Sequence, residues 1–300
     1  MSVASAAGGL LARCTFPPAG TPVRCGLSGG PDSVALVALA MAAGCDVVAV
    51  HVDHGLREGS VDDADTARAL AAAFRTTFEL HRLEIPDGAN LEARARAARL
   101  AVLGRDALLG HTADDQAETV LLNMLRGTGL QGLSGIAPGP THPILALRRA
   151  ETVGLAAEVA DELDVRIVDD PSNDDARFRR NRVRHELIPL LNDVAERDVV
   201  PLLARLADTA RDDVGMLDLL AGDLDPTDAR SLAAAPVALA RRSLRRWLAA
   251  DGYPPDAASV ERVLHVARGD AVACEITGGR RVHRRRGRLS LDTIQPVASS

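Results

Sequence analysis

The chain has 300 residues, 47% of them hydrophobic, and a formal net charge of −6. This length predicts two domains, and the absence of a long apolar run or a basic-then-apolar start predicts a cytoplasmic protein without a membrane segment. All 35 basic residues are arginine, which excludes a Schiff-base lysine and a Walker-type phosphate loop, and four scattered cysteines favour neither a disulfide framework nor a zinc site.

The first half of the chain alternates short apolar runs with segments of helical periodicity, which predicts an α/β domain with a parallel sheet and crossover helices. The predicted strands are Val23–Leu27, Asp46–Val52, Phe78–Ile85 and Ala107–Gly110, with others near Ile144–Leu147 and Arg166–Val168. The predicted helices are Val34–Ala42, Asp62–Phe74, Glu92–Leu103 and Asp115–Leu125. Because ligands of such sheets bind at the carboxyl ends of the strands, we expect polar motifs at those ends to form one site.

The second half of the chain changes character after Pro189. Helical segments without intervening strands follow, roughly at Val200–Leu220, Pro236–Ala250 and Ala258–Arg268. From Ala273 to Leu291 alternating residues predict a small β-hairpin or meander with a basic face. We therefore expect a catalytic domain at 1–195, a linker helix at 196–222 and a small, mainly helical C-terminal domain at 223–300 that ends in the basic hairpin.

A loop of small and acidic residues joins the first predicted strand to an apolar helix. Its residues are Ser28, Gly29, Gly30, Pro31, Asp32 and Ser33. Two glycines let the backbone approach an anion, and the start of the helix favours negative charge. The serines add hydroxyl donors, and Asp32 suits either a Mg²⁺ ion on the phosphates or a helix cap. A Gly-Gly-Pro turn is ordinary by itself, but the whole string after an apolar strand predicts a pyrophosphate-binding loop.

This string resembles the PP-loop of the N-type ATP pyrophosphatases, which cleave ATP between its α and β phosphates. Four further strings appear in the order found in the tRNA(Ile)-lysidine synthetase family: 51–57 (HVDHGLR), 90–96 (NLEARAR), 110–119 (GHTADDQAET) and 170–184 (DPSNDDARFRRNRVR). The resemblance covers about residues 23–185. The combination is more specific than any one string.

The resemblance implies a two-step reaction at the wobble cytidine of tRNA(Ile) with a CAU anticodon. ATP adenylates the oxygen on carbon 2 of the base, and free L-lysine then displaces AMP, giving lysidine, AMP and pyrophosphate. ATP and Mg²⁺ are the implied cofactors, while the tRNA and L-lysine are the implied partners. We expect no protein partner beyond a second copy of the chain in a homodimer.

The resemblance also assigns roles to individual residues. Nucleotide contacts are expected from residues 28–33 with His51, His54, Arg57 and His111, and catalytic roles from Asp32, Arg94, Asp115 and Glu118, with Asp32 also the metal ligand. Asp115 and Glu118 are three residues apart and share a helix face, where two carboxylates suit the ammonium groups of lysine. The alternative is that they only complement the helix dipole. A metal triad of histidines is disfavoured, because the spacing of His51 and His54 does not place both rings on one helical face.

Two arginine-rich segments are candidate RNA contacts on an acidic chain. In the first, the resemblance implies tRNA contact by Asn173, Arg177, Phe178, Arg180, Asn181 and Arg184, a set that mixes phosphate binding with one stacking surface. The second comprises the basic residues of 280–288 and the helix around Trp247, for which a solvated amphipathic face is the alternative. Leu100 and His142 depart from the family pattern, which has Tyr and Arg there.

The nearest rival is a PP-loop tRNA thiolase. Such enzymes use cysteines for sulfur or an iron–sulfur cluster, and the chain has none between Cys45 and Cys274. A PP-loop synthetase acting on a small molecule would lack the basic string that ends at Arg184. A non-catalytic nucleotide sensor would be expected to have lost Asp32, Asp115 or Glu118, and all three are present.

Overall fold

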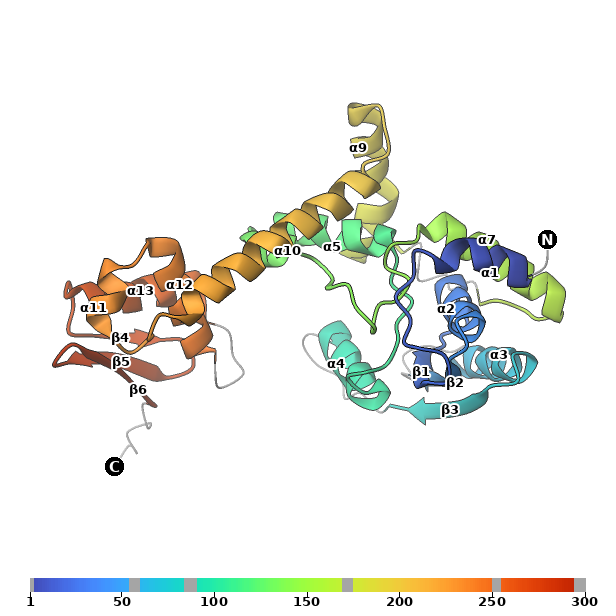
Figure 1. Cartoon of the computed structure of the whole chain (residues 1–300), viewed down its shortest axis with the longest axis horizontal. Helices are drawn as coiled ribbons and strands as arrows, with labels where there is room; N and C mark the ends of the chain where they lie inside the picture. Colours follow the sequence, from blue (N-terminus) through green and yellow to red (C-terminus); the bar gives the residue numbers. More distant parts are fainter. Residues whose placement is uncertain (1–2, 54–59, 84–90, 169–174, 250–254, 294–300) are drawn as a thin grey trace. The chain divides into compact units, whose positions relative to one another are not determined.

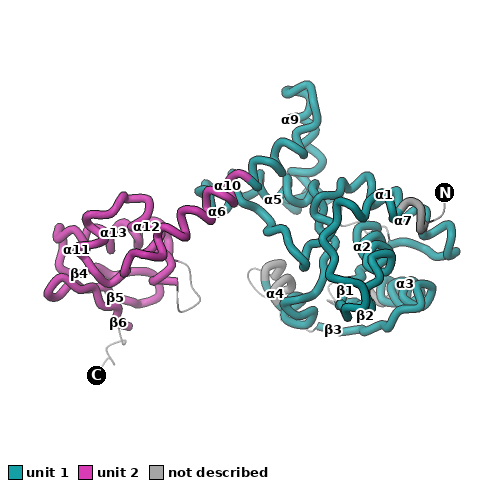
Figure 2. The backbone as a smooth tube through the Cα atoms, viewed as in Figure 1, with its two compact units in different colours: residues 1–208 teal, residues 209–300 magenta. Residues whose placement is uncertain are grey.

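The computed structural model describes residues 3–53, 60–83, 91–168, 175–249 and 255–293. The chain divides into two compact units, Met1–Asp208 and Thr209–Ser300 (Figure 2). The division falls within one long helix, α10 (Val200–Gly222). The domain boundaries expected at residues 195 and 222 stay predictions.

Unit 1 is built on a parallel sheet in the order β1-β2-β3 (Figure 1). Its strands are β1 (Pro22–Gly26), β2 (Asp46–Asp53) and β3 (Thr77–Arg82). Side chains alternate between the faces of β2: Val47 and Ala49 belong to the main core, whereas Val48 and Val50 pack on the opposite face with Leu103. Both faces are therefore covered, as the apolar strands predict.

The helices of unit 1 are α1 (Val3–Leu11), α2 (Pro31–Ala42), α3 (Ser60–Ala73), α4 (Leu91–Leu103), α5 (Ala113–Leu125), α6 (Leu130–Leu133), α7 (Arg149–Leu163), α8 (Arg179–Arg182), the π-helix η2 (Val183–Leu187) and α9 (Ile188–Ala195). Among them, α2, α3 and α4 pack against this sheet. Helix α2 is almost entirely buried and packs against α7 and α1. The N-terminus of α2 is thus held firmly at the edge where β1 ends.

The fourth predicted strand, 107–110, is reduced to a single bridge. Leu108 pairs in parallel with Cys25 on the free side of β1, with the Gly26 N–H donating to the Leu108 carbonyl at 3.0 Å. The next amide, that of Leu109, points to the opposite side of the segment and donates to the Thr141 carbonyl oxygen. Strand order still reverses at β1, with β2 on one side and the 107–109 segment on the other, which is where ligands of such sheets bind.

Two further predicted strands are wrong. Residues 144–147 form a turn whose side chains Ile144 and Leu147 are fully buried. In the 166–168 segment, Val168 makes a backbone bond to Gly29 but forms no strand. A short buried apolar run has the same composition whether it is a strand or a packed turn, so the pattern cannot separate them.

Unit 2 contains the rest of α10, three helices and an antiparallel sheet in the order β4-β5-β6. The elements are α11 (Ala229–Ala234), α12 (Val237–Leu248), α13 (Ala257–Arg268), β4 (Ala273–Ile276), β5 (Arg280–Arg285) and β6 (Arg288–Thr293). Leu244, Leu264 and Val282 meet in its core, which confirms the mainly helical domain that ends in a basic meander. Within the described part of the chain, no helix combines the length and apolar character needed to cross a membrane.

Candidate active site

The loop 28–33 leaves the carboxyl end of β1 and turns directly into α2, whose first residue is Pro31. Gly29 has φ +90°, and a Cβ there would lie 2.6 Å from Val168 Cγ2, so only glycine fits. The Ser33 hydroxyl donates to the Gly30 carbonyl at 2.8 Å and accepts from the Ser28 amide at 3.2 Å. These bonds fix the loop around the N-terminus of α2, which favours anions.

Asp32 lies on the first turn of α2 and faces the start of α7. Its carboxylate accepts a hydrogen bond from the Thr152 hydroxyl and lies 3.4 Å from Arg149 Nε. Burial raises the pKa of Asp32, while Thr152 and Arg149 oppose that rise without cancelling it. The loop therefore carries one carboxylate whose ionisation depends on two α7 side chains.

The Asp115 carboxylate both caps the start of α5 and binds arginines of the site. Its Oδ2 accepts from the Thr112 backbone N–H at 2.8 Å and from the Thr112 hydroxyl at 2.9 Å, which ties down the start of α5. Its Oδ1 receives Arg149 Nη2 at 2.9 Å and Arg180 Nη2 at 3.1 Å. Burial would raise the pKa of Asp115, but the guanidiniums of Arg149 and Arg180 outweigh it, so the net shift is downward.

Glu118 is fully buried and receives three guanidiniums. Arg149 Nη1 lies 2.9 Å from Oε1, Arg184 Nε lies 2.7 Å from Oε1, and Arg180 Nε lies 2.6 Å from Oε2. Burial would raise the pKa of Glu118, but the bond from Arg184 and the charge of Arg149 lower it overall. The arginine–carboxylate cluster of Asp32, Asp115, Glu118, Arg149, Arg180 and Arg184 thus joins the loop to α5.

Arg149, the first residue of α7, was missed by the sequence analysis although it contacts all three carboxylates of the cluster. Burial would lower the pKa of Arg149, but Asp115 and Glu118 outweigh it and raise it. The sequence signal available was the Arg148–Arg149 pair that follows a buried apolar run and opens a helix. The neighbouring Arg148 instead pairs with Asp114 at 3.0 Å.

Two of the predicted histidines, His51 and His111, lie in the described part of the chain. His51, on β2, is buried and its Nδ1 lies 2.8 Å from the carbonyl oxygen of Leu27, so it lies directly beneath the loop's first residues. His111 follows the 107–109 segment, and its ring lies 4.9 Å, centroid to centroid, from that of His142. His142, which stands where the family pattern has Arg, is therefore a neighbour of His111, a predicted nucleotide contact.

The other predicted residues are more scattered. Arg94 is partly buried on α4, and Leu100 is partly exposed on the same helix. Arg177 and Phe178 are exposed, and Arg177 pairs with Asp175. Asn181 is buried, and its amide donates to the Asp175 carbonyl at 3.0 Å. The predicted contacts His54, Arg57 and Asn173 lie outside the described residues.

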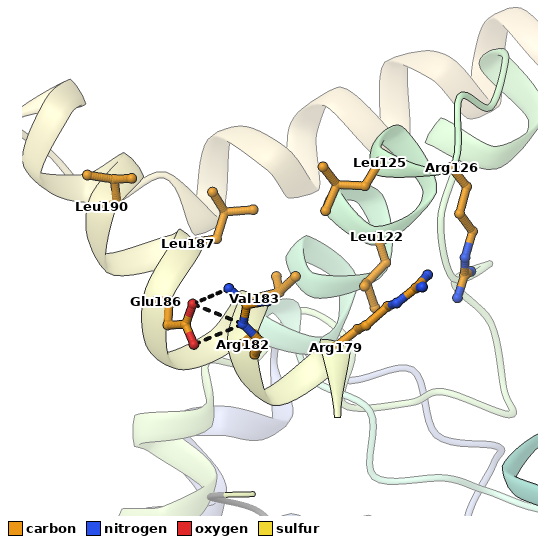
Figure 3. Close-up of a pocket in the computed structure, with 9 residues that line it drawn as sticks. All are labelled: Leu122, Leu125, Arg126, Arg179, Arg182, Val183, Glu186, Leu187 and Leu190. Carbon is orange, nitrogen blue, oxygen red and sulfur yellow. Dashed lines mark hydrogen bonds and ion pairs between the residues drawn. The ribbon is translucent and has the colours of Figure 1, made fainter. Parts of the chain in front are cut away.

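A separate apolar groove lies further along α5, between this helix and the η2–α9 segment (Figure 3). It is lined by Leu122, Leu125, Arg126, Arg179, Arg182, Val183, Glu186, Leu187 and Leu190. At its edge Arg182 and Glu186 form an ion pair of 2.8 Å. None of its lining residues belongs to the arginine–carboxylate cluster, so the groove and the carboxylate site are distinct.

Both parts of the chain match known protein families. A family model described as a PP-loop domain matches residues 13–191, and one described as the TilS substrate binding domain matches residues 228–290. Two curated relatives, both named tRNA(Ile)-lysidine synthase, come from Nocardia farcinica and Mycobacterium bovis. The first is 42% identical over 92% of this chain and 93% of its own length, and the second 37% identical over 91% of each.

Among solved structures, the U34-tRNA thiolase NcsA from Methanococcus maripaludis matches with a TM-score of 0.53. Identity is 17%, over 69% of this chain and 76% of that one. At this level of identity the match supports a shared fold, that of the sheet and helices of unit 1.

Proposed function

The chain belongs to the tRNA(Ile)-lysidine synthase family, and from that premise we propose that it converts the wobble cytidine of tRNA(Ile) with a CAU anticodon to lysidine. The observation that carries the proposal is the joining of two sites in one cluster. The pyrophosphate loop supplies Asp32, α5 supplies Asp115 and Glu118, and one guanidinium, that of Arg149, contacts all three. A reaction that uses ATP first and a cationic amine second needs both sites side by side.

In the first step the oxygen on carbon 2 of the cytosine attacks the α-phosphorus of ATP, and the bond to pyrophosphate breaks. Residues 28–33 are proposed to hold the β and γ phosphates at the N-terminus of α2. Mg²⁺ is often bound through one or two carboxylates together with substrate phosphates, and Asp32 at the end of this loop fits that role. A bound Mg²⁺ would neutralise charge on the phosphates.

In the second step an amine of lysine attacks carbon 2 of the adenylated base, AMP leaves, and the amine loses a proton. AMP is a far better leaving group than the original oxygen, so the protein needs to position the amine more than to supply a nucleophile. Asp115 and Glu118 are proposed to hold a lysine ammonium group. Carboxylates suit a cation, and in the structure both already bind cationic guanidiniums.

The tRNA is proposed to contact Arg177, Phe178, Arg180, Asn181 and Arg184, with a further part held by unit 2, which carries the substrate-binding match. We propose the catalytic domain at 1–195, the linker helix at 196–222 and the C-terminal domain at 223–300. A tRNA substrate also fits a cytoplasmic location. Sulfur transfer finds little support, because burial raises the pKa of Cys25 to about 12 and that of Cys14 to about 11.

The two half-reactions can be separated by mutation. Asp32→Ala should abolish tRNA-dependent release of pyrophosphate from ATP, because the loop loses its carboxylate. Glu118→Gln should retain pyrophosphate release and lose most incorporation of lysine. A transcript with uridine at the wobble position serves as the control for both measurements. Equal loss of the two steps in Glu118→Gln would contradict the lysine assignment, and pyrophosphate release that is indifferent to the wobble base would contradict the substrate.

A further inference from the structure

Two proposed roles compete for the same side chains in this structure. Arg180 and Arg184 are proposed tRNA contacts, yet their guanidiniums occupy the carboxylates proposed for lysine. Within the cluster, three guanidiniums face three carboxylates, Asp32 included, so the charges balance. A cationic amine that entered would meet carboxylates whose charge is already neutralised. Lysine therefore cannot enter until at least one arginine leaves.

We infer that Arg180 and Arg184 are exchangeable counter-ions that couple the two substrates: phosphates of the bound tRNA draw them off Glu118 and Asp115, and lysine takes their place. With both gone, Arg149 alone faces Asp32, Asp115 and Glu118, a local charge of −2 that favours a cationic amine. The exchange keeps the buried Glu118 paired throughout, which matters because an unpaired buried charge is costly. The inference rests on the proposed function and adds the order in which its site becomes available.

Arg149 is the member of the cluster that stays. Its backbone N–H donates to Asp114 Oδ2 at 2.8 Å, and its side chain also contacts Asp32. It opens a helix of 15 residues that packs against α2. The backbone of Arg149 is therefore fixed by Asp114 and by the packing of α7 on α2.

Arg180 and Arg184 lie on a helical stretch that contains a π turn. Helix α8, the π-helix η2, which carries Arg184, and α9 follow one another without a break over residues 179–195. Such π turns are rare and occur often at functional sites. The side chains of Arg180 and Arg184 are 32% and 23% exposed, against 21% for Arg149 and 0% for Glu118. Both side chains are therefore partly open to solvent.

The same segment offers RNA a first point of contact. Arg177 and Arg182 are 88% and 61% exposed, and Phe178 is exposed between them. Phosphates attracted by these outward arginines would arrive within a few residues of the two inward ones. A charge-assisted bond from guanidinium to phosphate can replace the one to carboxylate.

The test is equilibrium dialysis of radiolabelled L-lysine against the full-length protein without ATP, with and without unmodified tRNA(Ile) transcript. We expect the tRNA to tighten lysine binding by about tenfold or more, within the usual range of coupling between sites. By reciprocity, saturating lysine should tighten tRNA binding by the same factor in a filter-binding assay. RNA alone provides the blank. Equal lysine affinity with and without tRNA overturns the inference.

A variant adds a second line of evidence. Arg184→Gln should bind lysine several-fold more tightly than wild type in the absence of tRNA, and the gain from adding tRNA should shrink. Arg126→Gln is the matched control, since Arg126 ends α5 and bonds to Asn123 rather than to the cluster. Thermal melting checks that both variants fold. The reciprocal effect of lysine and tRNA on each other's binding is measured on the wild-type protein and does not depend on a variant. Lysine incorporation without coupling would contradict the inference alone, whereas no lysine binding or incorporation under any condition would contradict the proposed function.

Discussion

The substitution Gly110→Ala tests how closely the 107–110 segment approaches the pyrophosphate loop. A Cβ on Gly110 would lie 2.7 Å from the carbonyl oxygen of Asp32, 3.0 Å from its carbonyl carbon and 3.3 Å from the Ser33 nitrogen. All three are backbone atoms of the loop and of the first turn of α2, so no side chain can rotate away. Because ordinary contact starts at 3.4 Å, the loop must move by roughly 0.7 Å (3.4 minus 2.7).

A displacement of this size at a phosphate-binding loop should lower kcat/KM for ATP by roughly 100-fold, which corresponds to about 2.7 kcal/mol at 1.36 kcal/mol per tenfold change. The assay is tRNA-dependent pyrophosphate release at varied ATP. Gly154→Ala on α7 is the matched control, since its Cβ would meet nothing within 4 Å, and it should leave the kinetics unchanged. ATP kinetics within twofold of wild type in Gly110→Ala would refute the close approach.

Two more substitutions probe one carboxylate and one buried guanidinium. In Thr152→Val the Asp32 carboxylate loses a hydroxyl donor that lowers its pKa, so the pKa of Asp32 should rise further. As the pH is lowered, the variant should lose ATP-dependent activity at a higher pH than wild type does. Activity should recover at alkaline pH. In Arg280→Met the buried bond from the guanidinium to the Leu248 carbonyl, 2.7 Å long, is lost. Unit 2 should lose about 1.5–3 kcal/mol of stability in urea unfolding followed by the fluorescence of Trp247, the single tryptophan.

The first of these has a matched control, and both have an outcome that would contradict them. Thr66→Val removes a hydroxyl that donates to the Asp62 carbonyl on α3, and its pH profile should match wild type. An unshifted acid limb in Thr152→Val would show that the hydroxyl does not hold Asp32 ionised. Unchanged urea unfolding in Arg280→Met would show that the Leu248 carbonyl finds another donor at no cost.

The parts of the site that the sequence predicted are local in the chain. The pyrophosphate loop is one contiguous strand–loop–helix string, so its geometry follows from glycine, proline and the buried strand before it. Asp115 and Glu118 are three residues apart on one helix, and helical periodicity alone places them on one face. The antiparallel sheet of unit 2 was predicted for the same reason, because its alternation and turn glycines are adjacent in sequence.

The parts that were missed depend on contacts between distant segments. Arg149 meets Asp32 across 117 residues, and no spacing rule brings the start of α7 to the end of β1. The 144–147 run was predicted as a strand because buried turns and buried strands share apolar composition.

The competing roles of Arg180 and Arg184 were invisible for the same reason. The string 170–184 predicts cations for an RNA, and only the packing of α8 and η2 against α5 brings those cations to Glu118. Sequence identifies which residues carry charge, whereas the fold decides which charge each one meets.

The most direct measurement is incorporation of radiolabelled lysine into an unmodified tRNA(Ile) transcript with a CAU anticodon, with and without ATP and Mg²⁺. Labelling that requires ATP and disappears when the wobble cytidine is changed to uridine is the predicted result. Absence of labelling with the intact transcript, ATP and Mg²⁺ present would contradict the assignment of lysine and the wobble cytidine as substrates.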